Sequence, residues 1–432
     1  MAEGLRYSLH RYGTHELQRL GVWEFDGRDE DEGEGERYWI VFIHGGAWRD
    51  PRVDHEVFAT PCINRILSSP SLITSPHTTT STQGYERLPS DDEDESQTTT
   101  EKKIEKGDST PQPSSLKPPK QEAEEEVPEN EIAEKNMKEK KIKIAGFASL
   151  DYRLSPHPLF PQDPATTPVN AYRGAMHPDH VDDVRAALGY LHSREGKKGG
   201  LGYILVGHSA GGALAFQVLG RVGASDDENK SETEKEDEKE NKKEKEKEED
   251  RGKLPPPKAI ISISGLHDFR AINARRGNDA YAPFFRAAFG RDETDWDAAA
   301  PVKYAGNFDF ISSSESGSGS GSGGGGGLVI LASSPDDTLV DVPEVEGMAE
   351  RLMDVDGFVL EEEERADAET EEGDKEEEEE EEKGPAEEGK RNRLVVVKDL
   401  QGDHDDIWRD GEGVARLVRI ALRKLGGASG QV

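Results

Sequence analysis

Hydrophobic residues in this sequence gather into six short runs that are rich in β-branched side chains. Each run is between four and seven residues long and is almost free of polar residues. Continuous apolar runs of this kind are typical of strands buried on both faces of a parallel sheet. The predicted strands are Trp39–Ile43, Ile144–Leu150, Tyr203–Val206, Ala259–Ile263, Leu328–Ala332 and Leu394–Val397.

Segments with helical periodicity lie between these runs. The segment His180–His192 places Val181, Val184 and Leu188 on one face, at spacings of three and four residues. Ala210–Val222 and Val414–Leu425 show comparable patterns. Alternation of buried strands with amphipathic helices predicts an α/β fold with a doubly wound, mostly parallel sheet.

Composition changes this picture, because only 32% of the 432 residues are hydrophobic and the formal net charge is −35. Three segments, residues 81–140, 226–250 and 361–390, together carry −29 of that charge. They contain few aromatic residues and little apolar periodicity, so they cannot bury enough surface to offset the entropy of ordering. The acidity therefore belongs mainly to insertions, and the remaining 317 residues are close to neutral.

The insertions fall between the predicted strands and helices. Long insertions in surface loops cost little, because the entropy of loop closure grows only logarithmically with length. We therefore expect one α/β domain spanning residues 1–432. Its disordered insertions are predicted at residues 66–140, 223–256, 312–327 (almost pure Ser and Gly) and 361–392.

Composition also excludes several classes of protein. No run approaches the roughly 20 apolar residues of a membrane helix, and the N-terminus has no apolar signal segment. The single cysteine, Cys62, cannot form an internal disulfide and favours a reduced compartment, cytoplasmic or nuclear. The negative balance disfavours nucleic acid as a partner, because phosphate binding requires a basic face. A small-molecule substrate is the expected partner.

The most informative motif follows the predicted strand Tyr203–Val206. Gly207-His-Ser-Ala-Gly211 is a G-x-S-x-G sequence that leads into a helix of small residues. A nucleophilic serine must stand on a sharp strand-to-helix turn that exposes its hydroxyl, and glycines two residues before and after it avoid clashes there. Ser209 is therefore a candidate nucleophile, with Ala210 as a backbone N–H donor at the start of the helix.

A serine nucleophile needs a base and an acid, which in α/β-hydrolases follow it in the order acid, then histidine. An acid-rich loop follows Leu328–Ala332, and His404 follows Leu394–Val397. Asp337 fits a D-x-x-V-x-x-P pattern, and Asp336 and then Asp341 are the alternatives. The aspartates that are not used are expected to cap a helix that begins near Val342. Although Asp403, Asp405 and Asp406 flank His404, we expect no metal there.

An oxyanion hole is predicted directly after the first strand, in His44-Gly45-Gly46-Ala47-Trp48. Backbone N–H groups can converge on a reacting oxygen only where no side chain intervenes, so glycines and a small residue suit this role. Gly46 and Ala47, with Ala210, form the predicted donor set. Trp48 is expected to contribute an apolar wall for the substrate.

These motifs resemble the fungal kynurenine formamidases, which are HGGxW-type members of the esterase/lipase branch of α/β-hydrolases. The resemblance rests on the extended stretch HGGAWRDP, on Asp151-Tyr-Arg-Leu-Ser-Pro156, on His177-Pro-Asp-His180 and on the GHSAG motif. It covers the strands and their connections from about Tyr7 to Leu425, and it covers none of the insertions. Tyr152 is a further candidate for contact with the substrate.

The resemblance implies hydrolysis of N-formyl-L-kynurenine to L-kynurenine and formate, in tryptophan degradation towards NAD. Members of that family are cytosolic, often homodimeric, and need no cofactor. Carried over residue by residue, Ser209 is the nucleophile, Asp337 the orienting acid and His404 the general base. Ser333 and Ser334 stand where relatives often carry a histidine-serine pair, which leaves Asp336 and Asp337 both open.

Two other functions fit the same residues. The first is a general carboxylesterase, because identical catalytic groups cleave esters and formamides and the shape of the pocket decides between them. The second is a non-catalytic ligand-binding protein on a hydrolase fold. Such proteins usually lose a triad residue, whereas this sequence has candidates for all three.

Overall fold

The computed structural model describes residues 4–26, 36–68, 143–195, 202–222, 254–277, 280–308, 310, 326–363 and 391–426. The chain divides into two units, residues 1–74 with 140–432, and residues 75–139. Everything described below belongs to the first unit. Apart from their ends, the four predicted insertions lie outside the described residues. The whole of the second unit, residues 75–139, also lies outside them.

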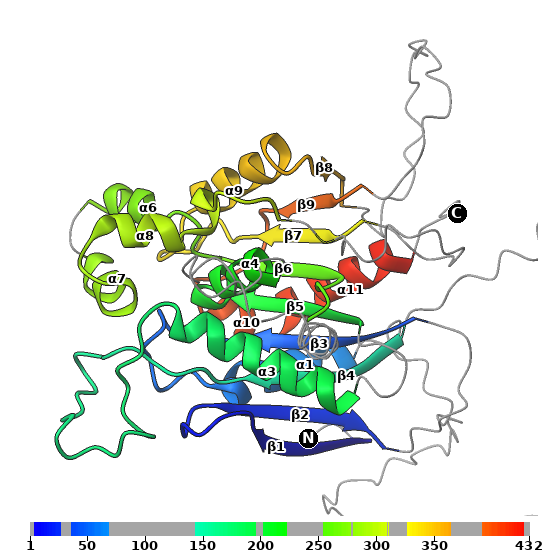
Figure 1. Ribbon diagram of the computed structural model, residues 1–432. Coiled ribbons are helices and arrows are strands. Elements are labelled where there is room, and N and C mark those ends of the chain that lie inside the picture. Colours follow the sequence, from blue (N-terminus) through cyan, green and yellow to red (C-terminus); the bar gives the residue numbers. More distant parts are fainter. Residues whose placement is uncertain are drawn as a thin grey trace, which may run out of the picture. The chain divides into compact units, whose positions relative to one another are not determined.

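The described strands form one nine-stranded sheet in the order β1-β2-β4-β3-β5-β6-β7-β9-β8 (Figure 1). Only β2 runs antiparallel to its neighbours, β1 and β4, and all other pairs are parallel. This arrangement confirms the predicted doubly wound, mostly parallel α/β class. The strands are β1 Leu5–Arg11, β2 Arg19–Phe25, β3 Arg37–Ile43, β4 Lys143–Leu150, β5 Gly202–His208, β6 Ala259–Ile263, β7 Leu328–Ala332, β8 Val359–Leu360 and β9 Arg393–Val397.

Helices cover both faces of the sheet. Three helices begin within two residues of their predicted starts, namely Asp179–Glu195, Ala210–Val222 and Glu412–Gly426, and Ala210–Val222 also matches at its end. Figure 1 shows α6, α7 and α8 gathered at the end of the sheet where the parallel strands terminate. The helices are α1 His55–Leu67, α3 Asp179–Glu195, α4 Ala210–Val222, α6 Phe269–Arg275, α7 Ala282–Phe289, α8 Glu293–Ala299, α9 Val342–Asp354, α10 Asp406–Arg409 and α11 Glu412–Gly426, with a 3₁₀ turn at Pro301–Lys303.

The central strands are apolar throughout because each face of the sheet packs against a hydrophobic core. In β3, Val41 and Ile43 pack into a core with α3, α4 and α9, whereas Ile40 and Phe42 pack into a second core with α1 and α11. Successive side chains of a strand point to opposite faces, so burial on both faces requires an unbroken apolar run.

The elements outside the sequence-based prediction include β1, β2 and α1. The strands β1 and β2 form an antiparallel pair at the edge of the sheet, and β1 alternates between exposed and half-buried positions. Helix α1 contains Pro61, which usually interrupts a helix. It continues through Leu67 and buries Ile66, so the first residues of the segment predicted as an insertion from residue 66 are helical.

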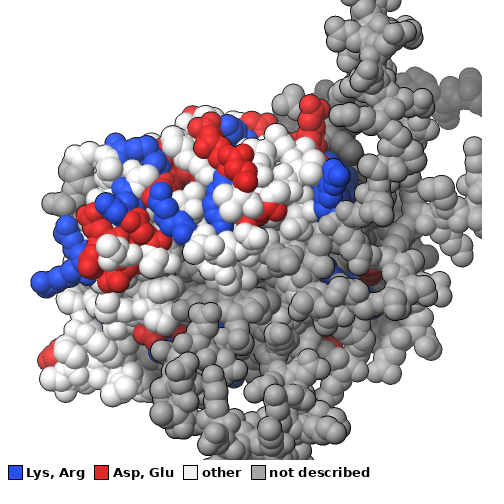
Figure 2. Space-filling view, turned by 45° about the horizontal axis from the view of Figure 1, so that its top comes forward, with Lys and Arg blue, Asp and Glu red and all other residues white. Residues whose placement is uncertain are grey.

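The described surface carries charges of both signs. Figure 2 shows basic and acidic side chains interleaved over the face that it presents. Pairs such as Arg270 with Asp297, and Lys398 with Glu346, contribute to this mixture. None of the helices within the described ranges is both long and apolar enough to cross a lipid bilayer.

Candidate functional site

Ser209 lies on the turn between β5 and α4. Its φ of +54° places it in the left-handed region, which is strained for a residue with a side chain. The turn is held to the neighbouring strand, because the N–H of Ser209 donates to the carbonyl of Ile263 at 2.9 Å. Ser209 is also 5% exposed. A strained, well-supported serine between a strand and a helix is the geometry of a nucleophile turn.

The two glycines of the motif are required by space. A Cβ on Gly207 would lie 2.3 Å from the carbonyl oxygen of Gly211, and a Cβ on Gly211 would lie 2.1 Å from that of Ile43. Contacts this short with backbone atoms cannot be relieved by a side-chain rotation. The spacing in G-x-S-x-G therefore follows from how closely β3, β5 and α4 approach one another at this point.

Asp337 and His404, which are 67 residues apart, meet at the ends of β7 and β9. Nδ1 of His404 lies 2.9 Å from Oδ2 of Asp337 and 3.1 Å from Oδ1. A carboxylate can only accept, so Nδ1 donates, and in the neutral ring the lone pair is then on Nε2. The side chain of Asp337 has no exposed surface, and its Oδ1 also accepts from the N–H of Val340 at 2.8 Å.

These contacts keep the Asp337 carboxylate ionised. Burial by itself raises the pKa of Asp337, but the hydrogen bond from His404 and the charge of that ring outweigh burial. The net effect lowers the pKa of Asp337 below its ordinary value. A buried anion at Nδ1 orients the imidazole and stabilises its protonated form.

The alternative aspartates lie elsewhere. Asp336 is exposed, and its backbone N–H donates to Oγ of Ser334 at 3.1 Å. Asp341 precedes α9, which begins at Val342 as predicted, but its side chain makes no capping hydrogen bond there. Its carboxylate pairs with Arg275 at 2.8 Å instead. The expectation that the unused aspartates cap this helix is therefore wrong for Asp341.

The HGGAW segment forms a turn with three consecutive left-handed residues. The φ angles are +84° at Gly46, +48° at Ala47 and +59° at Trp48. The turn lies directly against the candidate nucleophile, since a Cβ on Gly45 would be 3.0 Å from the Cβ of Ser209. Among the described residues, the N–H groups of Gly46, Ala47 and Ala210 donate no hydrogen bond.

Tyr152 contacts the backbone of this turn and stabilises it. Its hydroxyl donates to the carbonyl oxygens of His44 at 3.1 Å and Gly45 at 2.9 Å, and its ring stacks on that of His44 with centroids 4.5 Å apart. Tyr152 has no exposed surface. The sequence-based expectation that Tyr152 contacts the substrate is therefore corrected, because the side chain is enclosed and supports the backbone of the turn.

Trp48 is corrected in the same way. It is fully buried, and it packs among Phe269, Phe284, Phe285 and Phe289, with its ring centroid 4.9 Å from that of Phe289. It therefore offers no surface to a substrate. The residue instead fastens the turn to helices α6 and α7, which the sequence could not reveal because those helices are remote from it in the chain.

Sequence reasoning missed the role of Asp151. This carboxylate, at the end of β4, accepts from Nδ1 of His55 at 2.9 Å and from Nε of Arg19 at 2.8 Å. It also lies 3.7 Å from Nε2 of His44. Burial raises the pKa of Asp151, but these partners outweigh burial and lower it overall. Its position in the DYRLSP segment was the available signal.

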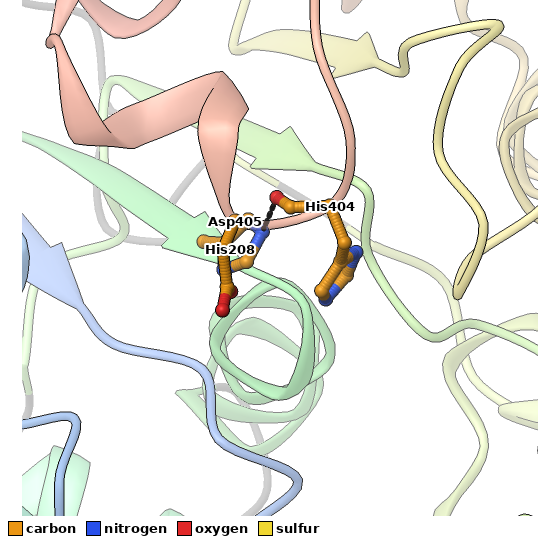
Figure 3. Close-up of side chains that lie close together, drawn as sticks. All are labelled: His208, His404 and Asp405. Carbon is orange, nitrogen blue, oxygen red and sulfur yellow. Dashed lines mark hydrogen bonds between the residues drawn. The ribbon is translucent and has the colours of Figure 1, made fainter.

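A further cluster joins His404 to the turn that carries Ser209. Nε2 of His208 lies 3.0 Å from the carbonyl oxygen of His404, and Figure 3 shows the two rings and Asp405 beside the end of β5. A carbonyl can only accept, so Nε2 of His208 donates. Burial, and then the charge of His404, lower the pKa of His208 well below its ordinary value. The loop that carries His404 is thus tied to the residue preceding Ser209.

The same three residues could in principle ligate a metal ion, because one potential ligand atom of each lies within 4.8 Å of the others. One nitrogen of each ring is already used, in His208 by the carbonyl of His404 and in His404 by Asp337. Asp405 pairs with Arg409 at 3.3 Å. Hydrogen bonding therefore accounts for the close approach of these groups.

Comparison with known proteins gives two relatives. A kynurenine formamidase-like hydrolase of Fusarium equiseti is 26% identical over 412 residues, which cover 94% of this chain and 90% of the relative. A kynurenine formamidase of Aspergillus versicolor is 28% identical over 280 residues, which cover 63% of this chain and 72% of the relative. No family model matches the chain.

Among solved structures, esterase B from Lactobacillus Rhamnosis is 11% identical with a TM-score of 0.49, over 98% of this chain and 87% of the esterase. The sheet itself is more informative, because it places a serine turn after β5, an acid loop after β7 and a histidine loop after β9, all of them parallel strands. The chain is thus similar over nearly its whole length to a kynurenine formamidase-like hydrolase, and it has the α/β-hydrolase fold.

Proposed function

We propose that this protein is a serine hydrolase in which Ser209 is the nucleophile, His404 the general base and Asp337 the orienting acid. The observation that carries the proposal is the hydrogen bond from Nδ1 of His404 to the buried Asp337, on a loop tied to the strained turn of Ser209. When the neutral ring carries its proton on Nδ1, the lone pair lies on Nε2, where a general base requires it.

The turn after β3 would supply the oxyanion hole. The N–H groups of Gly46 and Ala47 are unused among the described residues, and the N–H of Ala210, in the first turn of α4, has no acceptor within its own helix. Left-handed backbone at Gly46 and Ala47 turns these groups out of the usual strand direction. Loss of one such donor typically costs about 3 kcal/mol of transition-state stabilisation.

The proposed substrate is N-formyl-L-kynurenine. Its support comes from the names of the two relatives and from the HGGAWRDP stretch that the chain shares with that family. The product would be L-kynurenine in tryptophan degradation. A general carboxylesterase would use the same catalytic groups, so the experiment below must separate the two.

In the proposed reaction, His404 takes the proton of Ser209 as its Oγ attacks the formyl carbon. The oxyanion is held by the three N–H groups, and protonated His404 then gives its proton to the departing arylamine as the carbon–nitrogen bond breaks. Water, deprotonated by His404, attacks the formyl-enzyme. The ester bond to Ser209 breaks, Ser209 recovers its proton and formate leaves.

The test is formate release from N-formyl-L-kynurenine by purified protein. Ser209→Ala should lower kcat by at least about 10³-fold, and Asp337→Asn by about 10⁴-fold because the imidazole loses its orienting anion. Asp336→Asn is the matched control and should turn over like the wild type, since Asp336 is exposed and does not contact His404.

Two outcomes would reject the proposal. Strong preference for short p-nitrophenyl esters over N-formyl-L-kynurenine would instead identify a carboxylesterase. Failure of the folded wild type to react with a serine-directed fluorophosphonate, with Ser209→Ala as the reference, would instead favour a ligand-binding protein.

A further inference from the structure

A hollow of about 330 Å³ lies next to the residue that follows the HGGAW turn. Arg49, the residue after Trp48, forms one wall, and the loop that continues from the DYRLSP segment forms another with His157 and Phe160. Arg173 and Pro283 also line the hollow. The hollow thus combines two guanidinium groups and an imidazole with an aromatic ring and a proline.

The positive charge of this hollow is not balanced from within the described part of the chain. Neither Arg49 nor Arg173 forms an ion pair with any described carboxylate, although acidic residues outnumber basic ones by 90 to 55 in the sequence. Nearby arginines behave differently, since Arg52 pairs with Asp50 at 2.6 Å and Arg153 with Asp183 at 2.8 Å.

The two guanidinium groups are also held in place. Arg49 lies over the ring of Phe284 with its Cζ 5.4 Å from the centroid, and Nη2 of Arg173 donates to the carbonyl of Phe160 at 2.7 Å. Nε of Arg173 is buried and has no hydrogen-bond partner among the described residues. Burial lowers the pKa of Arg49 and is only partly offset by Asp50.

The positive charges around His157 also show that this hollow has a positive potential. Burial, followed by the positive charge of Arg49, lowers the pKa of His157, and Arg52 and Arg173 act in the same direction. Asp50 opposes them. Two arginines that line one hollow and have no carboxylate partner among the described residues suit an anion from outside the chain.

The hollow is joined to the candidate active site through the backbone. The N–H of Arg49 donates to the carbonyl oxygen of Gly46 at 3.0 Å, which closes a four-residue turn that contains Ala47. The preceding residue, Gly45, faces Ser209. Arg49 therefore belongs to the same turn as Gly46 and Ala47, and it is also one of the residues that line the hollow.

We infer that this hollow binds the carboxylate of the substrate, with Arg49 and Arg173 as the recognising groups. The inference rests on the proposed function, because N-formyl-L-kynurenine carries a carboxylate at the far end of its side chain from the formamide. The aromatic ring between them is apolar and suits Phe160 and Pro283. Arg49 is thus a specificity-determining residue for an aryl amino acid rather than for a neutral formanilide.

The experiment compares two substrates that differ only in the proposed contact, N-formyl-L-kynurenine and its carboxamide. Wild type should prefer the acid, and Arg49→Ala should lower kcat/KM for the acid by about tenfold to a hundredfold, mainly through KM. The preference for acid over amide should disappear. Arg49→Lys should restore part of it, because lysine keeps the charge and loses the planar fork.

Arg291→Ala is the matched control, since Arg291 is exposed and its loss changes the net charge equally. It should leave the ratio of acid to amide unchanged. Binding of L-kynurenine to Ser209→Ala, measured by titration calorimetry, gives a readout without turnover. Adding Arg49→Ala should weaken that binding by a similar factor.

The two proposals fail separately. Absence of formate release by wild type would reject the proposed function. If formate is released and Arg49→Ala discriminates between acid and amide as wild type does, or binds L-kynurenine as tightly, the carboxylate site is rejected while the hydrolase stands.

Discussion

At the scale of single residues, Asp151 links more parts of the site than any motif suggests. Its side chain is buried and contacts Arg19 from β2 and His55 from the start of α1, with His44 of the HGGAW turn close by. Nε2 of His55 in turn lies 3.0 Å from the hydroxyl of Tyr7 on β1. One carboxylate therefore fastens the edge hairpin, α1 and the turn that faces Ser209.

The free energy of unfolding should include a contribution from the Asp151 carboxylate, and this contribution should depend on pH. The pKa of Asp151 is lowered by folding, so the unfolded chain binds the proton more readily. Its contribution is then complete above the unfolded value near 4 and is lost as pH falls through the lower folded value. Asp151→Asn should cost about 3 kcal/mol of unfolding free energy at pH 7.

Urea unfolding of wild type and Asp151→Asn between pH 7 and pH 3 measures this. The difference between the two proteins should shrink as the solution becomes more acidic. Asp163→Asn, which removes an exposed carboxylate, serves as the control for net charge. A difference that stays constant over this range, or grows, would show that the charge of Asp151 is not what stabilises the fold.

At the scale of elements, the contact between β3, β5 and α4 decides where Ser209 stands. The carbonyl of Ile43 at the end of β3 occupies the space that a Cβ on Gly211 would need. By contrast, Gly189 in the middle of α3 has open space around its Cα. Replacing these two helical glycines by alanine should therefore change the stability of the protein in opposite directions.

Gly211→Ala should displace α4 from β3 and destabilise the protein by about 1–3 kcal/mol, with a larger proportional loss of turnover because Ser209 moves. Gly189→Ala should stabilise the protein by about 0.5–1 kcal/mol, because alanine loses less backbone entropy in a helix. Thermal unfolding and formate release measure both. Equal stability of the two variants would contradict the steric account of the motif.

Prediction of elements from sequence succeeded where burial alone dictates the pattern. Strands β6 and β7 match their predicted bounds because both faces are buried and every position must be apolar. The edge strand β1 was not recognised, because its residues alternate in exposure and include histidine and arginine. Helix α1 was not recognised because Pro61 lies within it, and its neighbours α10 and α11 stabilise the helix from outside its own sequence.

At the scale of the whole molecule, the last acidic segment begins with residues that belong to the folded domain. The predicted insertion 361–392 includes residues that the structure places in the domain. Glu363 pairs with Arg416 of α11 at 2.7 Å, and Glu361 pairs with Lys424 at 3.1 Å. The first few acidic residues therefore contribute to the domain, and the boundary lies beyond residue 363.

Removal of the acidic segments should leave the chemistry intact. Replacing residues 81–139, 226–250 and 366–388 by short Gly-Ser linkers should change kcat/KM by no more than about twofold, because surface loops of different length close at similar cost. The matched variant extends the last deletion through residues 361–363 and should be less stable, since it removes the partners of Arg416 and Lys424. Loss of turnover in a folded deletion variant would assign the segments a role in catalysis.

The sequence by itself determined the α/β class, the serine turn, the histidine loop and the glycine-rich turn after the first strand. These depend on local steric needs and on burial, both of which leave a readable pattern over a few residues. Only the tertiary structure brought Asp337 rather than Asp336 against His404, and enclosed Trp48 and Tyr152. It also gathered Arg49 and Arg173 at one hollow. Such contacts join residues far apart in the chain, and no local pattern records which of two neighbouring side chains turns inward.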